Sequence, residues 1–148
     1  MSYVLILAIL AVVVAPLLAV MPNKTQRRQA FIRERAREMG LRVYFRSLPE
    51  VPARYRFSPS SDLACYESSF PIHQQPSGRR LVYIWTEGGW HAVSGSETSP
   101  EWLWSLPEGV SLVMFSERSV CFFWDERGGV PALEQIGVAA ASCVQKMT

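Results

Sequence analysis

The sequence predicts an α+β protein with three consecutive parts: an N-terminal transmembrane helix (residues 1–22), a basic neck helix (23–40) and a small domain (41–148). The first 22 residues carry no charged side chain, and basic residues cluster directly after them. From residue 41 the apolar pattern changes from a helical period to the alternation typical of strands. We expect the domain to be a mostly antiparallel sheet of five or six strands packed with a C-terminal helix.

The predicted span covers residues 3–21, YVLILAILAVVVAPLLAVM. These nineteen residues rise about 28 Å as a helix and match the roughly 30 Å hydrocarbon core of a bilayer. A secretory signal peptide would begin with basic residues and end at a small-x-small cleavage site, and this segment has neither feature. A buried core helix fits poorly, because a domain of this size rarely needs a helix that is apolar on every face. We therefore expect a retained single-pass anchor, in which Pro16 is tolerated.

Charge is distributed unevenly after the span. Residues 23–46 hold eight basic and two acidic side chains, whereas residues 47–148 hold seven basic and eleven acidic ones. Because Lys and Arg beside a span stay on the cytoplasmic side, we expect the N-terminus outside and the domain in the cytoplasm. The basic cluster predicts contact with anionic lipid headgroups rather than nucleic acid, since no nucleic-acid-binding motif accompanies it. The predicted headgroup-binding residues are Lys24, Arg27, Arg28, Arg33, Arg35 and Arg37.

The neck is predicted to be a helix that Asn23 caps and that ends at Gly40, where a glycine can adopt the left-handed conformation. Its apolar positions form a narrow stripe: Ala30, Phe31, Ile32, Ala36 and Met39. The stripe fits a helix that lies on lipid headgroups and equally a helix that packs against the domain. A solvated neck is a further alternative.

Strand-like runs follow the neck at residues 41–46, 64–70, 81–86, 90–94, 110–116 and 120–124. Residues 48–62 contain three prolines and three serines and are predicted to form a loop. The TEGG segment before Trp90 and the SERS segment before Val120 are typical of tight reversals. Each is therefore expected to close an antiparallel hairpin.

Two helices are predicted within the domain. Ser99 and Pro100 are typical of an N-cap and a first helical position, and they indicate a short helix that ends at Pro107. A helix of about 16 residues is expected from Pro131. It places four apolar side chains on one face, which we expect to cover the sheet: Leu133, Ile136, Ala140 and Val144.

Aromatic residues are concentrated between residues 83 and 124. In the strand 81–86 both faces are apolar, so each must be covered. The C-terminal helix accounts for one face, and the neck, the membrane or another protein could cover the other. The aromatic residues therefore indicate either core packing or a partner-binding surface. The candidate partner surface comprises Trp85, Trp90, Trp102, Trp104 and Trp124.

The cysteines and histidines do not form a recognisable site. Cys65, Cys121 and Cys143 have wide, irregular spacing, which favours a reducing compartment over a disulfide framework. A zinc site would also need His73 or His91, and no two of these residues are spaced as a close ligand pair. A nucleophilic pair of Cys65 and His91 on neighbouring strands is an alternative without a supporting motif. We therefore predict no metal, no cofactor and no catalytic residue.

The DERGG segment, residues 125–129, lacks the longer P-loop or dinucleotide-binding pattern, and a strand-to-helix turn explains it. One enzymatic alternative stays open, a membrane-tethered enzyme that acts on a lipid headgroup or a nucleotide. Its candidate residues are His91, Asp125, Glu126 and Arg127. This alternative requires those side chains to converge in one pocket.

The uncharged start, the single span, Pro22 at its exit and the basic segment PNKTQRRQAFIRERAREMGL resemble the N-terminus of YajC, a bacterial inner-membrane accessory of the Sec translocase. The resemblance to YajC itself is limited to the span and the neck. The LPEGV, FFWDERGG and ALEQI stretches are similar to small uncharacterised bacterial single-pass inner-membrane proteins that are sometimes labelled YajC-like. The resemblance implies a location in the bacterial inner membrane and brings no catalytic residues.

These features together predict a non-catalytic accessory or interaction protein of the bacterial inner membrane. It would tether a small cytoplasmic domain to a membrane protein complex, through a partner that the sequence does not name. Lipid binding as the main function is a further alternative, because the neck is basic.

Overall fold

The structure, a computed structural model, describes residues 1–59, 63–71, 80–94 and 98–146. The chain divides into two compact units, Met1–Ala30 and Phe31–Thr148. The boundary falls inside the predicted neck helix rather than at residue 41. The last part of that helix therefore belongs to the domain.

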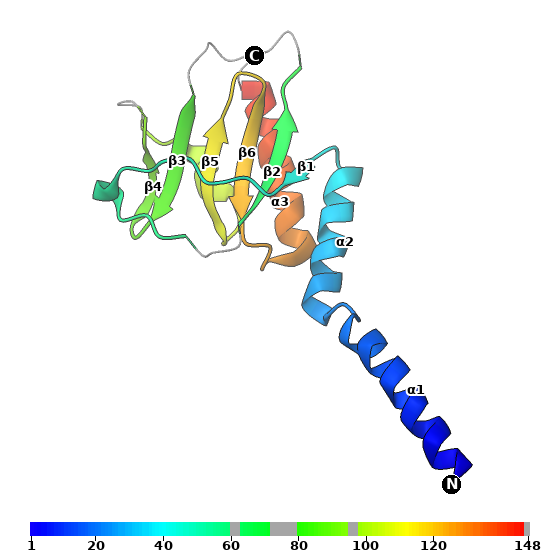
Figure 1. Cartoon of the computed structure of the whole chain (residues 1–148). Helices are drawn as coiled ribbons and strands as arrows, with labels where there is room; N and C mark the ends of the chain where they lie inside the picture. The colour runs from blue at the N-terminus through cyan, green and yellow to red at the C-terminus, as the bar shows by residue number, and fades with distance from the viewer. Residues whose placement is uncertain (60–62, 72–79, 95–97, 147–148) are drawn as a thin grey trace. The chain divides into compact units, whose positions relative to one another are not determined.

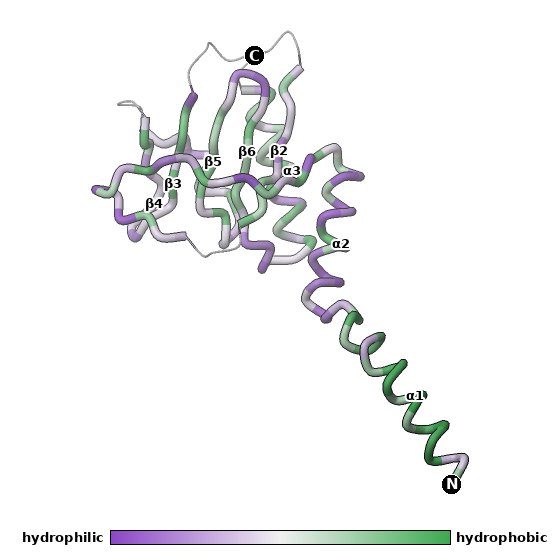
Figure 2. The backbone as a smooth tube through the Cα atoms, in the orientation of Figure 1, coloured by the Kyte–Doolittle hydropathy of each residue, from purple (hydrophilic) through white to green (hydrophobic). Residues whose placement is uncertain are grey.

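The first unit contains α1 (Ser2–Ala19) and the start of α2 (Lys24–Glu38). No residue of α1 is buried, and Figure 2 shows the helix as a continuous apolar stretch. Pro16 lies within α1 without ending it, as predicted. By length and composition, α1 can cross a membrane once.

The end of α2 is a glycine-capped turn, as its sequence predicts. Gly40 has a φ of +83°, and its N–H donates to the Arg37 carbonyl at 3.0 Å. The Leu41 N–H donates to the Ala36 carbonyl at 2.9 Å, which completes the bonds of the last helical turn. Ile32, Ala36 and Leu41 are buried in the core of the second unit. This part of the apolar stripe therefore packs against the domain, one of the arrangements that the sequence left open.

The second unit is built on a six-stranded antiparallel sheet with the order β1-β2-β6-β5-β3-β4 (Figure 1). The strands are β1 (Arg42–Tyr44), β2 (Ala64–Ser69), β3 (Leu81–Thr86), β4 (Gly89–Ala92), β5 (Val110–Phe115) and β6 (Ser119–Trp124). All six lie within or next to the predicted runs. Both predicted hairpins are present, since Thr86 pairs with Gly89 and Phe115 pairs with Val120.

One face of the sheet, which we call the helix-side face, packs against α3 (Gly129–Lys146) and the second half of α2. Figure 1 shows α3 lying behind the sheet. The helix begins two residues before Pro131, and it buries Leu133, Ile136 and Ala140 in the core, as its pattern predicts. The C-terminal helix therefore covers the sheet, and the predicted α+β class is confirmed.

A short helix, η2 (Glu101–Ser105), also packs on this face through the fully buried Leu103. It is a 3-10 helix, and Pro100 rather than Ser99 occupies its N-cap, without a side-chain cap. The predicted cap is therefore wrong. The segment between Pro100 and Pro107 is too short for a stable α-helix, whereas a 3-10 turn forms within so few residues.

The opposite face is covered by residues 47–59, which we call the strap. Its Leu48, Val51, Tyr55 and Phe57 pack against a buried cluster that includes Ile84. Figure 1 shows this segment crossing the sheet from β1 toward β4. Apart from η1 (Ala53–Tyr55), the strap forms neither helix nor strand, in agreement with its proline content. The strap therefore covers the second face, for which the sequence left the neck, the membrane or another protein as candidates, and the neck packs on the helix-side face instead.

A buried ion pair joins α2, β2 and the turn before α3. Arg33 donates from Nε and Nη2 to the two carboxylate oxygens of Glu126, each at 2.8 Å, and the Tyr66 hydroxyl donates to Oε1 at 2.7 Å. The Glu126 side chain is only 3% exposed. Burial, together with the hydrogen bond to Glu126, raises the pKa of Tyr66 above its ordinary range, and the same carboxylate raises the pKa of Arg33. Tyr66 therefore stays neutral and Arg33 stays charged at neutral pH.

Replacing Arg33 with Met should lower the free energy of unfolding by about 2 kcal/mol, because the buried Glu126 side chain would lose both hydrogen bonds from Arg33 and keep the one from Tyr66. Arg35→Met is the matched control on the same helix, since Arg35 forms an exposed pair with Glu38. It should change the same quantity by less than about 0.5 kcal/mol. Thermal unfolding of the full chain in maltoside micelles, followed by near-ultraviolet circular dichroism, measures both, and equal losses would contradict the assigned role of Arg33.

Candidate functional site

The sheet opens at one end, between β3 and β5. Pairing of these strands stops at Ile84 and Leu112, although β3 continues to Thr86 along β4 and β5 begins at Val110 along β6. A register shift between Val110 and Leu112 leaves Ser111 as an extra residue. Such a bulge bends its strand. The two strand ends therefore diverge, and we call the space between them the notch.

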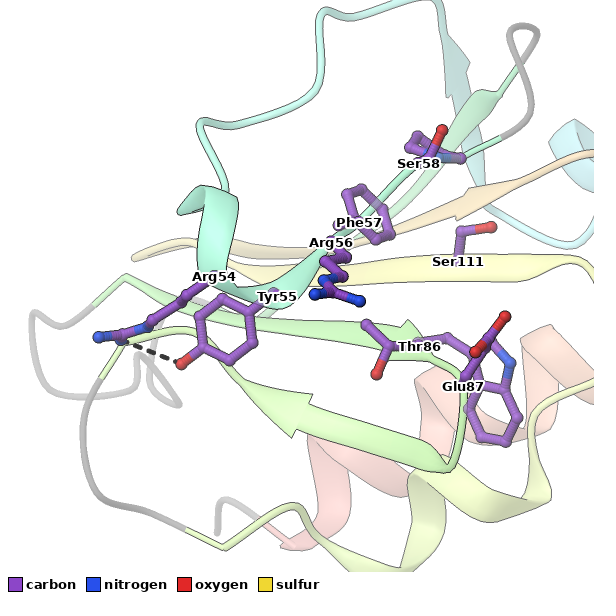
Figure 3. Close-up of a pocket in the computed structure, with 10 residues that line it drawn as sticks. Arg54, Tyr55, Arg56, Phe57, Ser58, Thr86, Glu87 and Ser111 are labelled. Atoms are coloured by element: carbon purple, nitrogen blue, oxygen red, sulfur yellow. Dashed lines mark hydrogen bonds between the residues drawn. The ribbon is translucent and has the colours of Figure 1, made fainter.

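The notch continues into a recess on the strap side of the sheet, with a volume of about 670 Å³ (Figure 3). The residues that define its polar character are Arg54, Arg56, Thr86, Glu87 and Ser111. Figure 3 shows the Arg56 side chain coming from the strap toward Thr86 at the end of β3, whereas the Arg54 side chain points away from it and reaches the Tyr55 hydroxyl. This recess can therefore accept a negatively charged or polar group.

The conformation of the strap positions the two arginines. Arg54 lies over the Tyr55 ring, 4.9 Å from its centroid, and donates to the Tyr55 hydroxyl at 3.1 Å. That hydroxyl donates to the Ala92 carbonyl at 3.2 Å, which fixes η1 to the edge strand β4. Arg56 has a φ of 48°, a left-handed conformation that is unusual for a residue other than glycine. The pattern of the sequence did not single out Arg54 or Arg56, because two arginines in a proline-containing loop carry no periodic signal.

A second recess opens from the notch on the helix-side face, with a volume of about 460 Å³. Its walls include Trp85, Trp90 and Trp104, and its floor contains residues 106–110. The Trp85 ring meets the Trp90 ring at 67° and the Trp104 ring at 80°, with centroids 5.6 Å and 5.7 Å apart. Trp85 lines both recesses. We call the helix-side recess the tryptophan recess.

The position of Trp104 depends on a glycine at the β3–β4 turn. A Cβ atom on Gly89 would lie 2.5 Å from a carbon of the Trp104 ring, which is too close for any side chain. Gly89 also has a φ of +134°. Nothing lies within 4 Å of a Cβ atom built on the neighbouring Gly88. Gly89 therefore leaves the space into which the indole of Trp104 packs.

The candidate partner surface is smaller than predicted. Trp85 and Trp104 are 45% and 58% exposed and remain on it. Trp124 is fully buried and Trp90 is 6% exposed, so neither offers its face to a partner. Trp102 is half-buried and packs on Phe115 and Phe122 at centroid distances of 5.9 Å and 6.5 Å. The prediction is therefore corrected to two exposed indoles, because strand alternation and the two face coverings place the other three in or near the core.

The predicted headgroup-binding residues lie on α2. Lys24, Arg27, Arg28, Arg35 and Arg37 are exposed, whereas Arg33 is held by Glu126. Arg35 and Arg37 also form exposed pairs within the helix, with Glu38 at 2.8 Å and Glu34 at 3.1 Å. Arg33 therefore supports the fold of the domain, and headgroup binding by the other five stays a prediction.

The structure does not bring together the residues of the enzymatic alternative. His91 on β4 pairs with Ile84 on β3. Ile84 pairs with Leu112 on β5, and Leu112 pairs with Phe123 on β6, so His91 and Phe123 lie in the same row at a distance of three strands. Three strand spacings, about 14 Å, therefore separate the backbone of His91 from β6, which ends before Asp125. Glu126 is occupied by Arg33 and Tyr66. His73 lies outside the described residues.

The three cysteines are buried, and the structure shows no disulfide between them. The thiols of Cys65 and Cys121 form a hydrogen bond on the strap-side face, and the Cys121 sulfur lies 3.9 Å from a Glu67 oxygen. This hydrogen bond lowers the pKa of Cys65, whereas the same bond and burial raise the pKa of Cys121. Within the described part of the chain, no three His, Cys, Asp or Glu side chains are grouped to hold a metal ion. The cysteines therefore contribute to the core.

No protein-family model, curated protein or solved structure matches this chain. The resemblance to YajC and to the YajC-like proteins stays a prediction.

Gly89→Ala should displace the Trp104 ring and lower the free energy of unfolding by roughly 1–3 kcal/mol more than Gly88→Ala does. Both glycines have positive φ values, so the control carries backbone strain of a similar kind without the contact to Trp104. Tryptophan indole N–H shifts in nuclear magnetic resonance spectra report the ring position, and thermal unfolding reports stability. If the two variants matched in both measurements, Gly89 would not position Trp104.

Proposed function

We propose that this protein is a non-catalytic accessory or interaction protein of the bacterial inner membrane, which tethers a small cytoplasmic domain to a membrane protein complex. The observation that carries the proposal is the pair of exposed indoles, Trp85 and Trp104, beside the notch. The domain covers both faces of its sheet with its own chain, and these side chains stay exposed. Exposed aromatic side chains beside a recess are the usual anchors of protein interfaces.

Membrane attachment is supported by α1, which is apolar on all sides and has no buried residue. Its eighteen residues rise about 27 Å, close to the hydrocarbon thickness of a bilayer. The exposed basic residues of α2 follow within a few residues, and they can contact anionic headgroups on the cytoplasmic side. The N-terminus would then face outward.

Tethering gives the domain a functional advantage without any additional contact. A domain held within a short linker of the bilayer meets membrane partners at a raised effective concentration, so a modest interface is sufficient. Two exposed indoles and a recess form an interface of that modest kind. The arrangement favours a subunit that joins a complex over one that acts alone.

Single-cysteine labelling tests the orientation. The native cysteines are buried, so a membrane-impermeant maleimide should react mainly with introduced ones. Ser2→Cys should be labelled in spheroplasts, whereas Glu117→Cys in the exposed β5–β6 turn should be labelled only after lysis. The reverse pattern would place the domain outside the cytoplasm.

Crosslinking in intact cells, followed by purification in mild detergent and mass spectrometry, tests the accessory role. We expect one stoichiometric membrane complex, and a Trp85→Ser, Trp104→Ser double variant should reduce its yield roughly tenfold or more, because such anchors dominate interfaces. Val138→Ser is the control, since Val138 is 68% exposed on α3, away from the notch. A wild-type protein that is recovered alone, or a double variant that keeps its complex, would contradict the proposal.

A further inference from the structure

The tryptophan recess has the geometry of an aromatic cage. Its indole rings meet at steep angles, so they form walls in different directions rather than one flat surface. Trp85 and Trp104 line the recess and are 45% and 58% exposed. The volume of about 460 Å³ falls in the range of small-molecule sites.

The charge of the recess favours a cation. Glu108 is the one charged residue among the lining residues that the structure describes, and neither Lys nor Arg is among them. The carboxylate of Asp125 packs against Gly109, in the space that a Cβ atom on this glycine would occupy. Arg127 offsets part of the Asp125 charge from 3.5 Å, so the counter-charge is assigned to Glu108, the acidic residue in the lining. The strap-side recess differs, because its arginines would repel a cation.

The composition of the walls restricts the kind of cation. An indole face attracts positive charge but accepts no strong hydrogen bond, so the walls would replace little of the hydration that a primary ammonium loses, and Glu108 alone could accept only part of its hydrogen bonds. A quaternary or alkylated ammonium has an apolar surface and little or no hydrogen-bonding capacity to lose. Trp is also the aromatic residue that binds cations best.

We propose that the tryptophan recess, with the exposed rings of Trp85 and Trp104 as walls and Glu108 as counter-charge, binds a quaternary or alkylated ammonium group. The site would hold that group by cation–π attraction and by the carboxylate, with no covalent step. This inference rests on the recess alone and holds whether or not the domain joins a membrane complex.

The test uses the full chain, labelled with ¹⁵N, in dodecyl maltoside, because a detergent with a choline headgroup would compete for the site. Tetramethylammonium chloride and choline chloride are titrated while the indole N–H signals are followed. Sodium chloride at equal ionic strength controls for screening. 3,3-Dimethylbutan-1-ol, which has the shape of choline without its charge, controls for apolar binding.

We expect saturable shifts of the Trp85 and Trp104 signals with both ammonium ions and none with sodium chloride or the neutral alcohol. Trp104→Leu and Glu108→Gln should each weaken binding roughly threefold to tenfold. Glu101→Gln should not change it, because Glu101 is exposed on η2 and does not line the recess. Circular dichroism checks that each variant is folded.

Three results would overturn the inference: no saturation with either ammonium ion, equal shifts with the neutral alcohol, or equal affinities of the Glu108→Gln and Glu101→Gln variants. The second result would identify an apolar pocket without charge selectivity. The third would remove the counter-charge from the site.

Discussion

The buried carboxylate of Glu126 is the constraint on which the domain depends. Its oxygens receive three hydrogen bonds, from Arg33 and Tyr66. Removing a carboxylate from water costs several kcal/mol, and only near-complete pairing offsets that cost. Glu126 also adopts a φ of +64°, a conformation that adds about 1–3 kcal/mol of strain. The pair therefore requires α2, β2 and the start of α3 to meet in one arrangement, and it sets where the chain leaves α2 toward β1.

A second constraint is that the sheet is apolar on both faces. The row through Tyr66, Phe122 and Val113 faces α3, while the row through Cys65, Phe123 and Leu112 faces the strap. Each face needs its own cover, and the chain supplies a helix for one and an irregular segment for the other. This explains why so many aromatic residues are core residues. It also explains why the exposed indoles occur at the notch, where β3 and β5 separate and neither cover extends over Trp85 and Trp104.

Local patterns were sufficient to predict most of the elements. Strand alternation, the glycines before Trp90 and the left-handed position of Gly40 each depend on residues close in sequence. The pairing of Arg33 with Glu126 could not be predicted, because 93 positions separate the two residues and eight basic residues of the segment were equivalent candidates. Trp124 and Trp104 were both assigned to the candidate partner surface, because their places in the fold also depend on contacts between residues far apart in the sequence. Trp124 is buried on β6 between the two covers of the sheet, whereas Trp104 is exposed on the short helix η2, and composition does not distinguish these positions.

The two exposed indoles connect the architecture with the proposed role. Trp85 and Trp104 are exposed and line one recess together with Glu108. Burying these two side chains would have stabilised the folded domain through the hydrophobic effect. Gly89 keeps the space for Trp104 open by excluding a side chain, at the entropic cost that glycine brings to a strand. The domain therefore gives up stability at the notch while the rest of its sheet is closed on both faces. Because the φ of +134° at Gly89 by itself favours glycine at this turn, the exposure of two indoles on an otherwise covered sheet is the stronger support for the proposed binding role.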